Sequence, residues 1–167
     1  MIYQRPPTDS PVDQGDIIDG CPVLRVTRFD VQQPDSPDIE CASSRVVVLS
    51  QTCDLAHQKA TLAVVAVALE AEQLVATGLL KAADLRGPVR AGRVFGWYFL
   101  PRHVTLGLPE LIVDLRQLHT LPIDVLAALC REGNRLARVE PLYRVHLSKH
   151  FADTYSRIGL PEPHETE

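Results

Sequence analysis

One stretch decides the fold of this chain: Arg45-Val-Val-Val-Leu-Ser-Gln-Thr-Cys-Asp-Leu-Ala-His57. Four apolar residues in a row, Val46 to Leu49, predict a buried strand. Because they do not alternate with polar residues, we expect both faces of that strand to be covered. Side chains able to do chemistry follow directly: Gln51, Thr52, Cys53, Asp54 and His57. The sequence therefore predicts a central strand over residues 45–50 and a turn near residues 54–59, which together hold the first candidate site.

Strands are predicted on both sides of this central strand. Residues 15–26 are rich in β-branched and apolar side chains but contain a glycine and a proline, which indicates a first strand with a bend or bulge. Residues 29–44 hold two prolines and several acidic side chains, and we expect them to form a long surface loop. Residues 61–69 are almost wholly apolar and are predicted to pair with the central strand as a hairpin.

Helices and strands are predicted to mix in the second half of the chain. Residues 70–86 are helix formers that end before a Gly-Pro pair, with Gly78 weakening the helix. Short strands are expected at residues 95–101 and 110–116, and a second helix at residues 121–130. A long helix is expected after Pro141, because one apolar stripe of helical spacing follows, which we expect to pack on the core: Tyr143, Leu147, Phe151, Tyr155 and Ile158.

The composition is that of a soluble globular protein of one domain. The chain has 167 residues, 46% hydrophobic and 23% charged, with a formal net charge of −4. This charge argues against a broad basic surface for nucleic acid, although it leaves room for a local basic groove. Since we recognise neither a signal peptide nor a membrane-spanning run, we expect a cytoplasmic protein without membrane contact. The four cysteines form no Cys-x-x-Cys pair and are expected to be free thiols.

Three segments are predicted along the chain. Residues 1–14 hold three prolines among polar residues and are expected to be an extended or mobile lead-in. Residues 15–160 are expected to form a single globular domain, and residues 161–167 an acidic tail. Strands outnumber helices up to residue 120, so the predicted fold class is β-rich α+β.

Three short motifs resemble the MazF/PemK toxin family. They are Gly15-Asp-Ile-Ile, Arg45-Val-Val-Val-Leu-Ser and Glu110-Leu-Ile-Val-Asp-Leu-Arg-Gln-Leu-His-Thr-Leu121, the last of which leads into a helix. The resemblance implies a small SH3-like barrel with peripheral helices, to which this chain would add its long C-terminal helix. It also implies dimers that cleave single-stranded RNA without a metal, so a homodimer is among the expected states.

The catalytic residues of the resembled family carry over incompletely. Its catalytic arginine corresponds to Arg28 or Arg45, but Ala68-Leu69-Glu70-Ala71 stands where the family has a catalytic Thr or Ser. We therefore expect a cytosolic module that is non-catalytic or altered in catalysis and binds a protein partner or single-stranded RNA. The alternative is a metal-independent endoribonuclease of the toxin type, using Arg45 with His103 or with the cluster from Thr52 to His57. No cofactor is expected.

A thiol or metal enzyme centred on Cys53 is a further alternative. A nearby base lowers the pKa of a thiol, and His57 could reach Cys53 if the intervening turn is helical, with Asp54 orienting the imidazole. The competing interpretation is structural, with Cys53 buried at the strand end and Asp54 capping the turn. A metal site would need further ligands, and the candidates are scattered along the sequence: Cys21, Cys41, His103 and His119. No metal site is therefore predicted.

An RNA site would combine cations that contact phosphate with an aromatic ring that stacks on a base. The candidates are Arg45, Arg102, His103 and Arg116, with Trp97 or Tyr98 as the stacking surface. Histidine and arginine are also the residue types that phosphodiester cleavage needs for proton transfer and charge stabilisation. The competing interpretation gives Trp97 to the core and pairs Arg116 with Asp114 or Glu110.

Overall fold

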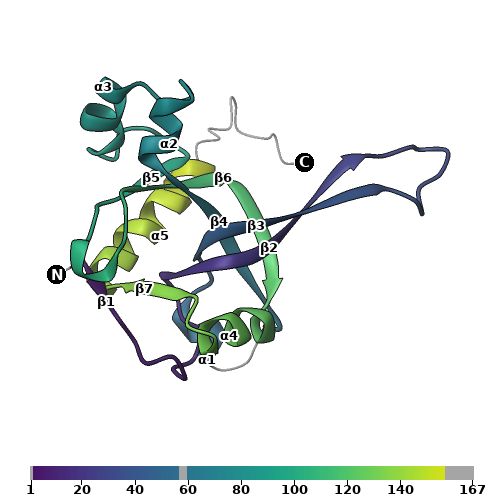
Figure 1. The fold of residues 1–167 in the computed structure, drawn as a ribbon, viewed down its shortest axis with the longest axis horizontal. Coiled ribbons are helices and arrows are strands. Elements are labelled where there is room, and N and C mark those ends of the chain that lie inside the picture. Colours follow the sequence, from purple (N-terminus) through teal and green to yellow (C-terminus); the bar gives the residue numbers. More distant parts are fainter. Residues whose placement is uncertain (1, 57–59, 157–167) are drawn as a thin grey trace, which may run out of the picture.

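The structure is a computed structural model that describes residues 2–56 and 60–156, and it is a strand-rich α+β fold (Figure 1). Its seven strands form one antiparallel sheet in the order β1-β7-β2-β3-β4-β6-β5. The strands are β1 (Tyr3–Gln4), β2 (Asp16–Arg28), β3 (Asp38–Val48), β4 (Leu62–Glu70), β5 (Trp97–Leu100), β6 (Leu111–Pro122) and β7 (Arg135–Val139). Five α-helices are described: α1 (Thr52–Ala56), α2 (Ala71–Ala76), α3 (Ala82–Asp84), α4 (Ile123–Arg131) and α5 (Pro141–Tyr155). A π-helical turn, η1 (Leu85–Val89), and a 3-10 turn, η2 (Val104–Leu106), complete the elements.

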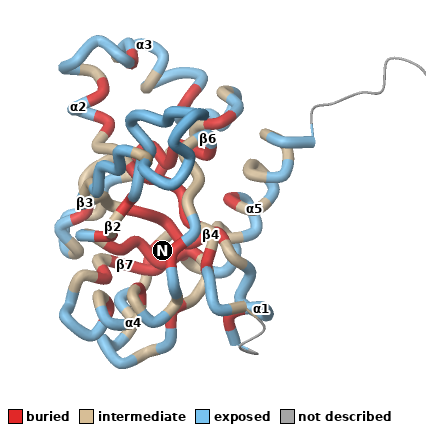
Figure 2. The backbone as a smooth tube through the Cα atoms, turned by 90° about the vertical axis from the view of Figure 1, so that its right-hand side faces the viewer, coloured by how far each residue is buried: buried red, intermediate tan, exposed pale blue. Residues whose placement is uncertain are grey.

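The central strand is buried on both faces, as its unbroken apolar run predicts. Val46 and Val48 pack in one core cluster, with Leu126 of α4 and Leu55 of α1. Val47 faces the other way, into a second cluster that contains Leu147 of α5. The buried chain therefore runs through the middle of the molecule, between helices on either side (Figure 2). The predicted hairpin is also confirmed, because Val46 to Val48 pair antiparallel with Val65 to Val67 of β4.

The sheet curls but does not close. Its two end strands are β1 and β5, and no backbone ladder joins them in the described part of the chain. One side-chain contact links the two ends, because the buried hydroxyl of Tyr3 donates to the Pro101 carbonyl at 2.7 Å. Of the segment predicted to be a lead-in, Tyr3 and Gln4 thus form a strand of the sheet, and Val12 is buried in the core.

The segment predicted as a long loop is in part a strand, so that prediction is wrong for residues 38–44. These residues belong to β3 and pair with β2, with Val26 opposite Ile39 and Leu24 opposite Cys41. Together the two strands project from the body as a two-stranded hairpin, the arm (residues 24–41), seen at the right of Figure 1. Because both strands are exposed here, their pattern lacks the burial signal that marks a core strand. The bulge predicted in the first strand is confirmed between Ile18 and Cys21.

The helix predicted over residues 70–86 is broken. α2 ends at Ala76, and Gly78 follows in the left-handed region with φ of +74°, a conformation that stops an α-helix. α3 and η1 continue after this turn as a separate lobe. Its buried side chains Leu80 and Val89 pack in one cluster with Leu74 of α2 and Ile112 of β6. The sequence predicts that Gly78 weakens the helix. In the structure, Gly78 ends it.

The C-terminal third differs from its prediction mainly in length. β6 runs on to Pro122, past the predicted end of its strand at residue 116, and α4 begins only at Ile123. β7 has no counterpart in the predicted elements, because two of its five residues are arginines. The stripe on α5 packs as predicted for three of its members: Leu147 is buried, and Tyr143 and Phe151 lie against the same cluster, whereas Tyr155 is 50% exposed. Ile158 and the acidic tail lie outside the described residues.

Candidate functional site

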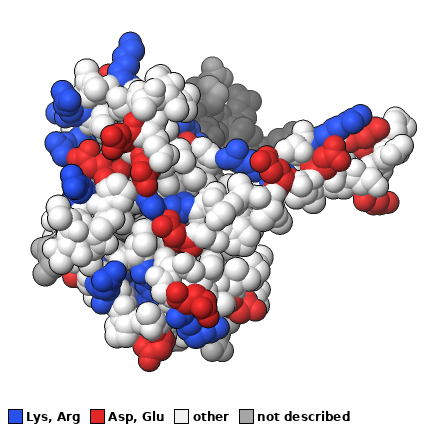
Figure 3. Space-filling model, in the orientation of Figure 1, with Lys and Arg blue, Asp and Glu red and all other residues white. Residues whose placement is uncertain are grey.

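A cleft of about 930 Å³ lies between α2, η1, β5 and η2. Three arginines face it: Arg86 and Arg90 from the lobe that follows α2, and Arg102 from the turn after β5. Phe99 contributes an aromatic ring, and the apolar lining comes from Val75, Leu85 and Val104. Blue and red side chains gather together over this part of the surface, at the upper left of Figure 3. The cleft thus offers cations, apolar surface and carboxylates within one open space.

The charges in the cleft are not equally available. Arg90 pairs with Glu110 at 3.0 Å and lies 5.1 Å from the centre of the Phe99 ring, so both its charge and one face of the ring are engaged. Arg86 and Arg102 are exposed, and within residues 2–56 and 60–156 their side chains form no hydrogen bond or ion pair. Glu72 is an unpaired acidic side chain of the same lining. Counted in full, the charged lining is balanced, with three arginines against three glutamates, and its unpaired cations are Arg86 and Arg102.

Arg45, the predicted catalytic arginine, is held by two carboxylates. Its guanidinium donates to Asp19 at 2.6 and 3.1 Å and to Glu70 at 3.1 Å. Burial alone would lower the pKa of Arg45, but these hydrogen bonds and charges outweigh it and raise the pKa. The three side chains line a small pocket of about 240 Å³ next to the cleft, which it meets at Glu70. A guanidinium neutralised in this way has little charge left for a phosphate.

The cluster after the central strand is exposed, which contradicts the structural interpretation of Cys53 as buried. α1 begins at Thr52, and Cys53 lies on its surface with its Sγ 3.6 Å from Gln51 Oε1 and 3.8 Å from Asp54 Oδ1. Both neighbours are oxygen acceptors, and neither is a cation that would stabilise a thiolate. His57, the predicted base, lies outside the described residues. Thr52 is engaged elsewhere, because its hydroxyl accepts from Arg144 at 3.3 Å.

The predicted RNA residues fall into separate places. Trp97 and Arg116 do come together, with the guanidinium 5.1 Å from the ring centre, while Arg116 also pairs with Asp114 at 3.0 Å. Burial alone would raise the pKa of Asp114, but hydrogen bonds from Arg116 and Gln117 lower it. His103 instead meets the ring of Tyr3, and its Nδ1 is buried without a hydrogen-bond partner among the described groups. Of the predicted arginines, only Arg102 lines the large cleft.

The predicted histidine and cysteine ligands are scattered as well. Cys21 and Cys130 are buried, whereas Cys41 is exposed on the arm. His119 lies beside Arg25, and its pKa is lowered by burial and by that positive charge. Within the described ranges, no three or more His, Cys, Asp or Glu side chains gather as a metal site would require.

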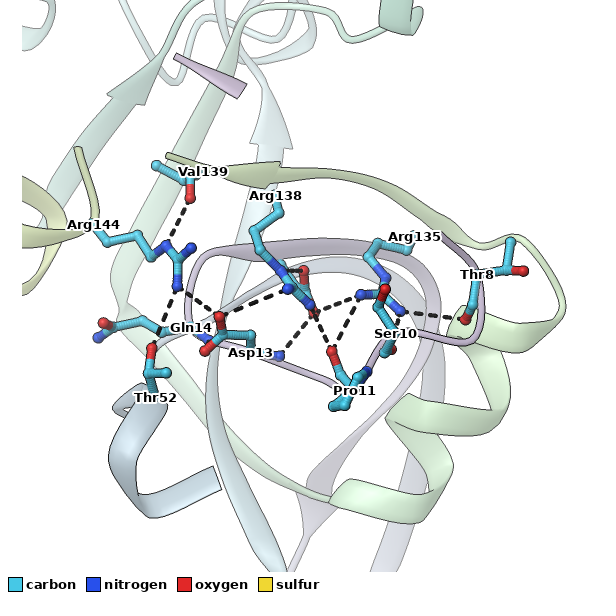
Figure 4. A network of polar contacts seen from close by, with 11 residues as sticks. Thr8, Ser10, Pro11, Asp13, Gln14, Thr52, Arg135, Arg138, Val139 and Arg144 are labelled. Atoms are coloured by element: carbon cyan, nitrogen blue, oxygen red, sulfur yellow. Dashed lines mark hydrogen bonds and ion pairs between the residues drawn. The ribbon is translucent and has the colours of Figure 1, made fainter. Parts of the chain in front are cut away.

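A buried polar network lies at the other end of the molecule, and sequence reasoning missed it (Figure 4). Asp16 is fully buried and accepts from Arg138 at 2.6 and 2.9 Å, with Arg135 3.5 Å away. Asp13 pairs with Arg144 of α5 at 2.7 Å. Burial alone would raise the pKa of Asp13, but hydrogen bonds from Thr52 and the Gln14 backbone, with the charge of Arg144, lower it. The network ties the N-terminal segment to β7 and α5, so its role is structural.

Comparison of the chain with protein-family models gives no match, and comparison with curated proteins gives none either. None of the helices in the described part of the chain combines the length and the apolar character needed to span a membrane.

Proposed function

We propose that this chain is a non-catalytic binding module of the cytoplasm, similar in fold to the MazF/PemK barrels, and that its ligand is single-stranded RNA. The observation that carries the proposal is the pair of unpaired, exposed arginines, Arg86 and Arg102, in the cleft of about 930 Å³. Arginine binds phosphate oxygens through a planar fork of donors. An open cleft is also suited to a single strand, whose bases can splay onto apolar and aromatic side chains.

Two further features support the proposed similarity in fold to the MazF/PemK barrels and the proposed absence of catalysis. The sheet curls until Tyr3, at one end, donates a hydrogen bond to Pro101, just past the other end, which is the curvature that a small barrel needs. The groups that cleavage would require do not meet in the cleft: Arg45 is neutralised by Asp19 and Glu70, and His103 packs on Tyr3. Binding by the free arginines is therefore the activity best supported.

The test is fluorescence anisotropy of a labelled single-stranded RNA oligonucleotide with the wild-type chain and the Arg86→Ala/Arg102→Ala variant. We expect the double variant to bind at least tenfold more weakly, because each removed phosphate contact also removes a counterion-release contribution. The dependence of log Kd on log salt should flatten by about 1.4, since single strands contribute about 0.7 per phosphate contact. Arg131→Ala is the matched control, because Arg131 is an exposed arginine of α4 away from the cleft.

Two results would overturn the proposal. An unchanged Kd and salt slope in the double variant would remove the cleft as the binding site. Cleavage of the same oligonucleotide by the wild-type chain in the presence of chelator, lost in Arg45→Ala, would replace the binding module by an endoribonuclease. Intact RNA on a denaturing gel is the expected result.

A further inference from the structure

The arm has an open edge along β3. β4 pairs with β3 only from Val46 to Val48 and then diverges from it, so in the described part of the chain no strand lies beside residues 38–45 on that side. The backbone N–H and C=O groups that point outward from this edge therefore have no partner in the sheet. An open edge of this kind is a template for the addition of one more strand. Residues 38–45 extend over roughly 26 Å, at about 3.3 Å per residue.

One face of the arm is apolar and exposed. Val26 of β2 lies opposite Ile39 of β3. Two residues away on each strand, Leu24 lies opposite Cys41, so all four side chains share one face. Leu24, Val26 and Ile39 are 59%, 62% and 58% exposed. Contiguous exposed apolar side chains mark an interaction surface, and a third strand stabilises a hairpin that is marginally stable by itself.

The other face of the arm is charged, and its acidic side chains lie on the strand with the open edge. Asp38 and Glu40 occupy alternate positions of β3 and form no ion pair among the described residues. The basic residues of the arm, Arg25 and Arg28, belong to β2, one strand further from the edge. Arg25 is also engaged with the body, since it donates to Gln117 of β6 at 2.8 Å. A strand added beside β3 therefore has carboxylates as its nearest charged neighbours.

The open edge leads into a pocket that is acidic as well. This pocket of about 240 Å³ lies where β4 diverges from β3, and residues 43–45 and 67–70 line it from the two strands. Its charged side chains are Asp19 and Glu70, which are acidic, and Arg45, which pairs with both. The β3 edge and the pocket together present four carboxylates against one guanidinium. Such a surface repels the phosphates of nucleic acid and of anionic lipid and is complementary to a basic partner.

We propose that the β3 edge of the arm binds an extended, basic segment of another protein, which adds to the sheet as one more strand. The segment alternates apolar and basic side chains: its apolar ones lie beside Ile39 and Cys41, and its basic ones lie beside Asp38 and Glu40. Backbone hydrogen bonds hold the segment, and the alternation of its side chains selects it. Residues 38–45 do not line the cleft proposed for RNA, so the inference does not depend on RNA binding.

The test is fluorescence anisotropy of a labelled peptide of about eight residues that alternates lysine and valine, titrated with the full chain. The wild-type chain should bind it with a Kd below about 500 μM and bind the matching glutamate–valine peptide at least tenfold more weakly. Asp38→Lys/Glu40→Lys should reverse this preference, because the edge then carries two positive charges. Methylation of every backbone nitrogen of the lysine–valine peptide should abolish its binding, because the hydrogen bonds to the edge are lost.

A matched control separates this edge from a general charge effect. Asp30→Lys/Asp35→Lys makes the same change of net charge at the tip of the arm, outside β3, and its Kd for the lysine–valine peptide should stay within about threefold of the wild type. Far-UV circular dichroism checks that each variant keeps the fold. Hydrogen exchange of the complex should show new protection of backbone amides in residues 38–45.

Four results would overturn the proposal. The first is a Kd of the wild-type chain for the lysine–valine peptide above about 500 μM. The second is a folded Asp38→Lys/Glu40→Lys variant that keeps the wild-type preference, or a tip variant that loses it as fully. The third is new protection confined to residues 20–28, which would place the peptide on β2. The fourth is a wild-type dimer that the peptide dissociates in sedimentation, which would show that a second copy covers the edge.

Discussion

Removing the carboxylate of Asp16 should destabilise the whole domain, because this side chain accepts two hydrogen bonds from Arg138 and lies 3.5 Å from Arg135. Asp16 is fully buried, and the side chains of Arg135 and Arg138 around it are only 2% and 11% exposed. Asp16→Ala leaves both guanidinium groups in place without the Asp16 carboxylate, and only Arg138 retains a second one, that of Asp13 at 3.7 Å. A charge that stays buried after its partner is removed carries an uncompensated desolvation cost.

The magnitude follows from what the two arginines retain. Breaking a buried ion pair from one side costs about 3–5 kcal/mol. Arg138 keeps the Pro11 carbonyl at 2.6 Å and the Asp13 carboxylate at 3.7 Å, and Arg135 keeps the Ser10 carbonyl at 2.6 Å. The cost should therefore lie near the lower limit, about 3 kcal/mol. With a urea m-value of about 2 kcal/mol/M, the unfolding midpoint should fall by about 1.5 M. That is a large share of the roughly 5–15 kcal/mol that stabilises a typical domain.

Urea unfolding can be followed by the fluorescence of Trp97, the single tryptophan, and by far-UV circular dichroism. Asp9→Ala is the matched control, because Asp9 is an exposed aspartate of the same N-terminal segment, and its free energy of unfolding should change by less than about 0.5 kcal/mol. Asp16→Asn should fall between the two, since it keeps an acceptor but loses the charge. A midpoint for Asp16→Ala equal to that of the control would refute the argument that the network stabilises the fold.

Three other outcomes follow from the same structure. Gly15→Ala should cost roughly 1–3 kcal/mol, because φ is +81° and the new Cβ would lie 3.0 Å from Val139 Cβ; Gly20→Ala, equally left-handed but uncrowded, should cost less in the same urea titration. The lowered pKa of Asp13 contributes stability that is present above about pH 4 and lost as pH falls through the folded value; Asp13→Asn should therefore flatten the loss of stability on acidification. Burial raises the pKa of Cys21 to about 12, so a thiol reagent at neutral pH should modify exposed Cys53 quickly and Cys21 only on unfolding.

Much of the fold follows from local pattern. The run from Val46 to Leu49 predicts its own burial, because apolar side chains on both faces of a strand are stable only between two covered layers. The stripe on α5 predicts its packing for the same reason, since helical spacing puts its members on one side. The sequence does not predict β7, because two of its buried residues are arginines. Their charges are compensated by the carboxylate of Asp16, which lies far away in the chain.

The candidate site could be predicted only in its residue types. Trp97 and Arg116 do meet, because Trp97 pairs with Asp114 across strands β5 and β6, and Arg116 lies two residues further along β6. The sequence predicts Arg45 and Arg102 as equivalent candidates. In the structure, Arg45 is neutralised by Asp19 and Glu70, whereas Arg102 is unpaired among the described residues. Arg86, which lines the cleft, has no motif around it, and the break of the predicted helix at Gly78 is what places it there.

The sequence alone determined the central strand, its hairpin with β4 and the inward stripe of α5, because hydrophobic burial is proportional to apolar area and acts on each segment separately. Only the tertiary structure decided which charged side chains form ion pairs and which remain unpaired. An ion pair depends on distances of a few ångströms between residues far apart in the chain, and no local pattern encodes those distances. For this reason the run from Val46 to Leu49 lies in the core of the protein, while the cleft that carries its candidate function is lined by residues between 70 and 110.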